Sequence, residues 1–172
     1  MKDGAAKKRS VTRRSNRRVI RVALVDVPPV VREGLRSVWD VPDIEVGGEA
    51  ESGEAAAALV RSLEPHVLVL DIKMPGKGGL EAIKAVKAIR PRTAVLVFTI
   101  YNDAETLRKA VLCGAAGYLC KDATGLELLN MIRRIAAGED VLDRAVLREV
   151  IRSQQPPKGA PGDAFERATQ DL

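Results

Sequence analysis

The segment Val67-Leu68-Val69-Leu70-Asp71-Ile72-Lys73-Met74-Pro75-Gly76 decides the fold class. Four consecutive apolar residues indicate a strand that is buried on both faces, as in a parallel sheet covered by helices. The proline and glycine that follow indicate a turn. Asp71 therefore stands where a parallel sheet opens its binding crevice, at the carboxyl end of a strand. This position suits chemistry on the carboxylate better than it suits a solvated surface charge.

Similar apolar runs recur along the chain. Runs at 20–25, 44–46, 94–98 and 117–119 are rich in Val and Ile and predict further strands. Between the runs, apolar residues at helical spacing predict five helices. Their shared faces are Val31, Leu35 and Val38; Ala56, Leu59, Val60 and Leu63; Leu80, Ile83, Val86 and Ile89; Ala104, Leu107 and Val111; and Leu128, Leu129, Ile132, Ile135 and Ala136. This alternation predicts an α/β fold with a doubly wound parallel sheet.

Residues that favour helix ends agree with this pattern. Pro28-Pro29 fits the start of the first helix, where a missing N–H costs little. Ser52 is a candidate N-cap of the second helix. Pro91 and Gly138 fit the ends of the third and fifth helices.

Composition excludes several protein classes. The 172 residues are 46% hydrophobic but only 3% aromatic, which predicts one domain with an aliphatic core. No apolar stretch reaches the roughly 18 residues of a membrane span, and the N-terminus lacks the apolar segment of a secretory signal. Cys113 and Cys120 are too few for a disulfide framework or a zinc site. We therefore expect a cytoplasmic protein without membrane contact.

The basic charge is concentrated at the N-terminus. Residues 1–21 carry nine Lys or Arg and one acid, a net +8, so the rest of the +5 chain carries −3. We expect residues 1–18 to form a disordered basic arm, and no aromatic side chain is interleaved to favour nucleic-acid stacking. We expect residues 19–140 to form the folded domain, residues 141–153 a short extra helix and residues 154–172 a linker or tail. The Pro- and Gly-rich part of this segment, 154–162, is followed by only ten residues, which indicates a piece of a longer protein or a lost partner domain.

Polar side chains occur where four predicted strands end. Asp26, Asp71, Thr99 and Lys121 each close or follow a strand, so a parallel sheet would bring them to one edge. Two carboxylates, a hydroxyl and an ammonium suit Mg²⁺ and a phosphoryl group. Each residue alone has an ordinary explanation, such as a helix cap or a surface ion pair. Their joint occurrence favours a site.

The segment from about Val19 to Ser153 resembles the receiver (CheY-like) domain of bacterial two-component response regulators. It is most similar to the NarL/FixJ type, in which the receiver precedes a LuxR-type helix-turn-helix DNA-binding domain. The resemblance rests on Val25-Asp26, Val31-Arg32-Glu33-Gly34-Leu35, Leu70-Asp71-Ile72-Lys73-Met74-Pro75-Gly76, Thr99, Gly114-Ala115-Ala116-Gly117-Tyr118-Leu119 and Lys121-Asp122. It implies a flavodoxin-like (βα)5 fold with strand order 2-1-3-4-5, and a signalling protein rather than an enzyme.

The resemblance also implies roles for individual residues. Asp71 would be the phosphoacceptor, and Asp26, Asp71 and the carbonyl of Lys73 would hold Mg²⁺. Thr99 would bind a phosphoryl oxygen and Lys121 would pair with the phosphoaspartate. Thr99 and Tyr118 would form the switch. No organic cofactor is implied.

One departure from the family pattern affects the expected metal site. The family normally has a second acid directly after Asp26, whereas this chain has Val27, and Pro28 replaces a residue that is usually polar. Loss of a carboxylate ligand should weaken Mg²⁺ binding. Two interpretations follow: a phosphorylatable receiver that switches a dimerisation or output surface, or an atypical, phosphorylation-independent receiver that serves as a dimerisation or docking module.

A third interpretation, an enzyme or nucleotide-binding protein on the same sheet, is disfavoured. A dinucleotide or P-loop site needs glycines after the first strand, but Pro28-Pro29 there removes backbone donors. No second acid closely follows Asp71, as an aspartyl phosphatase would usually require. The expected partners are a sensor histidine kinase and a second copy of the chain. DNA would be bound through an output domain absent from this chain, or weakly through the basic arm.

Overall fold

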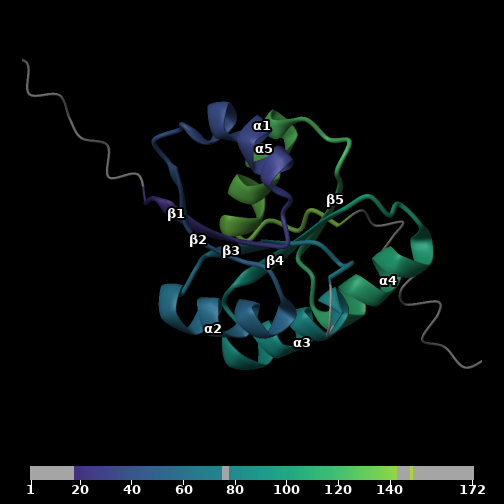
Figure 1. Ribbon diagram of the computed structural model, residues 1–172. Coiled ribbons are helices and arrows are strands. Elements are labelled where there is room, and N and C mark those ends of the chain that lie inside the picture. Colours follow the sequence, from purple (N-terminus) through teal and green to yellow (C-terminus); the bar gives the residue numbers. More distant parts are fainter. Residues whose placement is uncertain (1–17, 75–77, 143–147, 149–172) are drawn as a thin grey trace, which may run out of the picture.

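The computed structural model describes residues 18–74, 78–142 and 148 (Figure 1). Five parallel strands form one sheet in the order β2-β1-β3-β4-β5, which confirms the predicted α/β flavodoxin-like fold. The strands are β1 (Ile20–Val25), β2 (Ile44–Ala50), β3 (Val67–Leu70), β4 (Ala94–Thr99) and β5 (Gly117–Cys120). The expected arm, linker and most of the expected helix at 141–153 lie outside the described residues.

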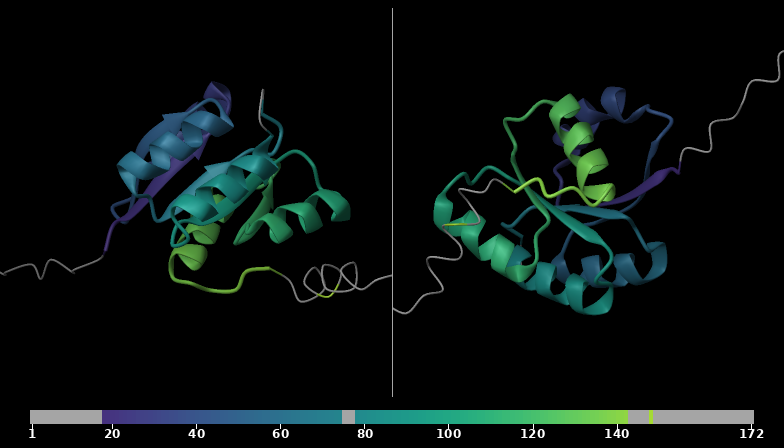
Figure 2. Two further views of the ribbon diagram at one scale, coloured as in Figure 1. Left: turned by 90° about the horizontal axis from the view of Figure 1, so that it is seen from below. Right: turned by 180° about the vertical axis from the view of Figure 1, so that it is seen from behind.

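Helices cover both faces of the sheet. Figures 1 and 2 show α1 and α5 on one face and α2, α3 and α4 on the other. Their bounds are α1 (Pro29–Trp39), α2 (Gly53–Leu63), α3 (Gly79–Ile89), α4 (Ala104–Cys113) and α5 (Gly125–Ala136). Among the described residues, none of these helices has the length and apolar character of a membrane span.

Two of the predicted helix starts are confirmed. α1 begins at Pro29, and the Ser52 side chain caps α2 by accepting the N–H of Ala55 at 3.2 Å. The sequence analysis missed the capping box of α5, in which Thr124 and Glu127 satisfy each other's backbone N–H groups. These caps fix where the loops at the carboxyl edge of the sheet enter their helices.

Alternating strand residues build two core layers. Ala23, Leu68 and Val97 pack on the side of α2 and α3. Leu24, Val69 and Phe98 pack on the side of α5. Every residue of β3 is buried, as expected for the central strand of a covered parallel sheet.

Two predictions about individual side chains are wrong. Ala104 was predicted on the packed face of α4, but it is exposed, and Ala110 is the residue of α4 that is buried. α4 packs mainly against α3 at the end of the layer, so only a narrow stripe is covered. The position of His66 directly after Glu64-Pro65 predicts a solvent-facing loop residue, but His66 is partly buried, and its Nδ1 accepts the backbone N–H of Arg21 at 2.9 Å.

β2 extends beyond its predicted range because it contains a bulge. The register with β1 shifts between Val22, which pairs with Val46, and Ala23, which pairs with Gly48. A Cβ at Gly47 would lie 2.6 Å from a methyl group of Leu63, so glycine lets α2 approach this strand closely. The two glycines give no hydrophobic signal, which is why the sequence pattern ended the strand too early.

Candidate functional site

Backbone hydrogen bonds hold the strand ends at one edge of the sheet. The N–H of Asp26 donates to the carbonyl of Ala50 at 2.9 Å, and that of Asp71 donates to Val25 at 3.3 Å. The N–H of Lys121 donates to the carbonyl of Thr99 at 2.9 Å. The structure therefore brings together the four residues that the sequence placed at this edge.

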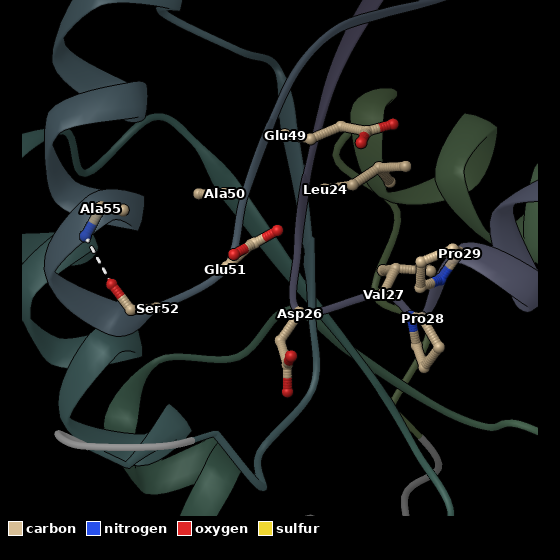
Figure 3. Close-up of a pocket in the computed structure, with 10 residues that line it drawn as sticks. All are labelled: Leu24, Asp26, Val27, Pro28, Pro29, Glu49, Ala50, Glu51, Ser52 and Ala55. Atoms are coloured by element: carbon tan, nitrogen blue, oxygen red, sulfur yellow. Dashed lines mark hydrogen bonds between the residues drawn. The ribbon is translucent and has the colours of Figure 1, made fainter.

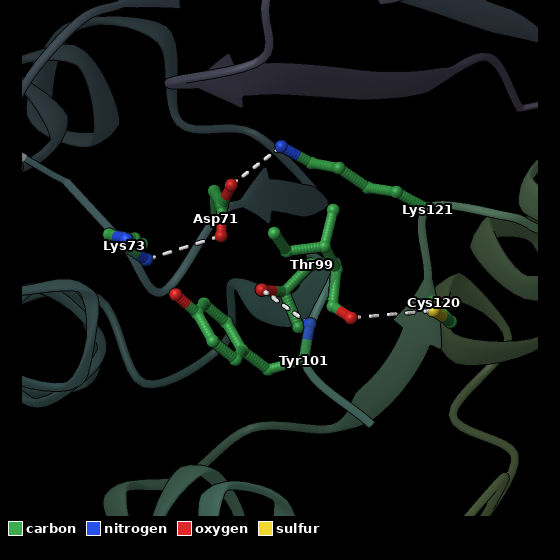
Figure 4. A network of polar contacts seen from close by, with 7 residues as sticks. Asp71, Lys73, Thr99, Tyr101, Cys120 and Lys121 are labelled. Carbon is green, nitrogen blue, oxygen red and sulfur yellow. Dashed lines mark hydrogen bonds and ion pairs between the residues drawn. The ribbon is translucent and has the colours of Figure 1, made fainter. Parts of the chain in front are cut away.

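Asp71 is the most strongly held side chain at this edge. Its residue is only 7% exposed. Lys121 Nζ lies 2.5 Å from Asp71 Oδ2, and the backbone N–H of Lys73 donates to Oδ1 at 3.1 Å. Figure 4 shows Asp71 between these two partners. Each oxygen of the carboxylate therefore has a donor, as a buried carboxylate requires.

The start of α3 is held close to Asp71 by a glycine. The N–H of Gly79 donates to the carbonyl of Ile72 at 2.9 Å. A Cβ at Gly79 would lie 2.6 Å from the carbonyl oxygen of Asp71, closer than real side chains approach. Any other residue there would push the start of α3 away from Asp71 and Ile72.

Thr99 and Tyr118 lie on the neighbouring strands β4 and β5. Thr99 is fully buried, and its Oγ1 accepts the N–H of Tyr101 at a long 3.5 Å. The Tyr118 hydroxyl donates to the backbone carbonyl of Tyr101 at 2.5 Å. Burial raises the pKa of Tyr118 to about 12, so its phenol stays a neutral donor at physiological pH. Both side chains thus contact the segment that follows β4.

Tyr101 is a site residue that the sequence analysis missed. The Lys73 ammonium lies 5.8 Å from the centre of its ring, and a hydrogen bond with the Tyr101 side chain raises the pKa of Lys73. Figure 4 shows the ring beside Thr99 and Lys73. The only sequence signal was its position two residues after Thr99, which no general pattern marks as functional.

Asp26 is less well satisfied than Asp71. Its backbone has a φ of 51°, in the left-handed region that non-glycine residues seldom adopt. Burial and the charge of Asp71 raise the pKa of Asp26, and Lys121 opposes this rise. No group within residues 18–74 and 78–142 forms a hydrogen bond with the Asp26 carboxylate. The Asp26 and Asp71 carboxylates therefore repel each other without full compensation.

These two carboxylates fit a Mg²⁺ ion that keeps most of its water. Asp26 and Asp71 offer hard oxygen atoms on adjacent strand ends, and their repulsion is what a cation would relieve. No cluster of three or more His, Cys, Asp or Glu side chains that could hold a metal occurs in the described part of the chain. Two carboxylates supply only part of an ion's ligands, so a Mg²⁺ ion held by them would keep most of its water.

Val27 does not contribute a polar group to the site. It is 7% exposed and belongs to the core layer that includes Leu24 and Leu128. Beside it lies an open hollow of about 900 Å³, which also contacts Asp26, Pro28 and Glu51. Figure 3 shows Asp26 between Glu51 and Val27 at this hollow.

Known proteins with similar sequences are response regulators. Residues 22–133 match the family described as the response regulator receiver domain. The response regulator GacA of Pseudomonas protegens is 36% identical over 155 residues, which cover 88% of this chain and 73% of GacA. The nitrate/nitrite response regulator protein NarL of Escherichia coli is 37% identical over 133 residues, which cover 77% of this chain but only 62% of NarL.

Solved structures agree with these sequence matches. A two-component response regulator of the LuxR family from Aurantimonas sp. superposes with a TM-score of 0.68 at 32% identity, covering 78% of this chain and 97% of that one. The signal receiver domain of the putative response regulator NarL from Mycobacterium tuberculosis gives 0.66 at 32% identity, covering 71% and 99%. The phosphorylation-independent interpretation finds no support among these relatives.

The family match covers well over half of the chain, and the sheet order agrees with it. This chain therefore belongs to the response regulator receiver family, as a receiver domain of the NarL/LuxR type that acts in two-component signalling.

Proposed function

We propose that Asp71 accepts a phosphoryl group from a sensor histidine kinase. The observation that carries this proposal is the buried Asp71 carboxylate with Lys121 Nζ at 2.5 Å, at the carboxyl edge of the sheet. Receiver domains are signalling proteins that undergo phosphoryl transfer at such a site. The carboxylate of Asp71 supplies an oxygen that can act as a nucleophile.

The proposed chemistry uses groups already placed around Asp71. An oxygen of the Asp71 carboxylate attacks phosphorus, a new O–P bond forms, and the P–N bond to the kinase histidine breaks as its electron pair returns to the imidazole. Lys121 then neutralises charge on the phosphorylated side chain, and the Lys73 N–H remains a donor beside it. Mg²⁺, when bound, would offset the charge between the carboxylate and the incoming phosphoryl group.

We propose Thr99 and Tyr118 as the switch that reports this modification. The Thr99 hydroxyl has only a long contact at 3.5 Å, so it can exchange that contact for a phosphoryl oxygen at small cost. The Tyr118 hydroxyl contacts the carbonyl of Tyr101, two residues after Thr99. A movement of this segment toward Asp71 would therefore change the contacts of Tyr118 on β5.

The metal requirement should be high in this protein. Asp26, Asp71 and the carbonyl of Lys73 would hold Mg²⁺, and Val27 supplies no oxygen. We therefore propose weaker Mg²⁺ binding than in receivers with two adjacent acids. Dimerisation and regulation of transcription through a DNA-binding output domain are properties of this family that we propose for the whole protein. A cytoplasmic location is part of the same proposal.

Intact mass measured after incubation with acetyl phosphate across a Mg²⁺ series tests this function. The wild-type chain should gain one phosphoryl group, with a larger fraction modified at higher Mg²⁺. Asp71→Asn should gain none, whereas Asp122→Asn, which removes an exposed acid next to Lys121, should still be modified. A gain that persists in Asp71→Asn, or no gain in the wild type at any Mg²⁺ concentration, would refute the proposal.

A further inference from the structure

The bulge in β2 places Glu51 beside Asp26, where Val27 stands in place of the family's second acid. Because the register shifts at Gly47, Val25 pairs with Ala50. The residues that directly follow this last pair are Asp26 after β1 and Glu51 after β2. If the register of the Val22–Val46 pair continued without a bulge, Asp26 would instead lie opposite Ala50. The bulge therefore brings the Glu51 backbone level with Asp26.

Glu51 also lines the same hollow as Asp26 and Val27. Together with Asp26 and Val27 it lines the hollow of about 900 Å³. Figure 3 shows Glu51 on the side of Asp26 opposite Val27. The hollow leaves room for the Glu51 carboxylate to change its rotamer beside Asp26.

The Glu51 carboxylate is available for such a role. Glu51 is exposed, and the described residues include no hydrogen-bond or ion-pair partner for its side chain. The residue before it, Ala50, accepts the backbone N–H of Asp26 at 2.9 Å, so Glu51 carries its charge close to Asp26. Glu51 therefore adds negative potential at the place where the missing acid would have added it.

From this geometry we infer that Glu51 compensates for Val27 by holding the hydrated Mg²⁺ through a bound water. Direct coordination is disfavoured because no cluster of three potential ligands occurs within the described residues. A hydrated Mg²⁺ accepts such outer contacts readily, since it gives up its water reluctantly. The inference deepens the proposed function and rests on the site at Asp26 and Asp71.

The structure also explains why position 51 could take over from position 27. Val27 packs on one side in the apolar layer with Leu24 and Leu128 and lines the hollow on the other, so an acid there would be partly desolvated. Glu51 lines the same hollow but is exposed to solvent, so its charge costs little desolvation. The negative charge would thus have moved from β1 to the neighbouring strand end.

Calorimetric titration of the full chain with MgCl₂ tests the inference in the absence of any phosphodonor. Glu51→Gln should weaken Mg²⁺ binding about five- to tenfold, as expected for the loss of one charge near a divalent ion. Glu54→Gln is the matched control, because Glu54 is an exposed acid of α2 that does not line the hollow. It should change the affinity less than twofold, and circular dichroism should show both variants folded.

Two further variants separate the inference from the function on which it rests. In a Val27→Asp background, Glu51→Gln should have less than a twofold effect on Mg²⁺ affinity, because the family's usual acid is restored. If Asp26→Asn weakens binding but Glu51→Gln behaves like Glu54→Gln, the inference is wrong and the proposed site stands. If Asp26→Asn leaves the affinity unchanged, the site itself and the inference both fail.

Discussion

The proposed acceptor side of the site, at Asp71, and its proposed metal side, at Asp26, are built very differently. On the acceptor side, Asp71 is buried and each of its oxygens has a donor, from Lys121 or the Lys73 backbone. On the metal side, Asp26 has a left-handed backbone, a raised pKa and an apolar neighbour in Val27. The proposed acceptor is thus preorganised by the protein alone, whereas the proposed metal side would depend on an ion to balance its charge. The metal should therefore limit phosphorylation of this receiver.

The largest expected effect comes from breaking the acceptor side. Lys121→Met should slow phosphorylation by acetyl phosphate about 100-fold, because the charge on Asp71 and on the transferring group loses its cation. Lys109→Met removes a lysine from an exposed ion pair with Glu105 on α4 and should leave the rate within twofold. Time courses of intact mass measure both rates. Equal rates in the two variants would mean that Lys121 does not serve the acceptor.

The next effect tests how firmly Val27 belongs to the core. Val27→Asp should lower the free energy of unfolding by about 1–3 kcal/mol without Mg²⁺, because a charge enters an apolar layer. Val30→Asp, at a position that is 75% exposed, should cost less than about 0.5 kcal/mol. Urea unfolding gives both values. A Val27→Asp protein as stable as the wild type would show that position 27 already faces water.

A smaller effect should come from relieving the repulsion at Asp26. Its raised pKa means that the charged form destabilises the fold, so Asp26→Asn should be more stable than the wild type at pH 7 without Mg²⁺, by roughly 0.5 kcal/mol. This advantage should shrink as the pH falls through the pKa of Asp26, where the wild-type carboxyl also becomes neutral. Thermal melts between pH 7 and pH 3 measure the difference. A destabilised Asp26→Asn protein at pH 7 would contradict the account.

The smallest expected effect concerns His66, at the opposite end of the sheet. Burial and the nearby charges of Arg21, Arg18 and Arg90 lower its pKa. The folded state therefore binds the proton less readily than the unfolded state, so stability is full at high pH and is lost as the pH falls below about 6.5. Between pH 7.5 and pH 5.5, the free energy of unfolding of the wild type should fall further than that of His66→Gln, by up to about 1 kcal/mol. Parallel urea titrations at the two pH values would show no such difference if His66 titrates freely.

The sequence predicted the sheet and the strand-end residues because both depend on local signals. Short apolar runs, proline at a helix start and Asp71 after a buried strand can be recognised without tertiary information. The placement of Glu51 beside Asp26 could not be recognised, because it depends on a bulge at two glycines. The contact of Tyr118 with Tyr101 and the packing of His66 also join segments distant in sequence. What remained hidden was therefore pairing between elements, not the elements themselves.

The most direct test compares the Mg²⁺ concentration needed for half-maximal phosphorylation of the wild type and of Val27→Asp, measured by intact mass with acetyl phosphate. If the metal side is limiting, Val27→Asp should reach half-maximal modification at about tenfold lower Mg²⁺, with the same final extent. The same half-maximal concentration in both proteins would contradict the account, because an added carboxylate at position 27 would then contribute nothing to the metal site.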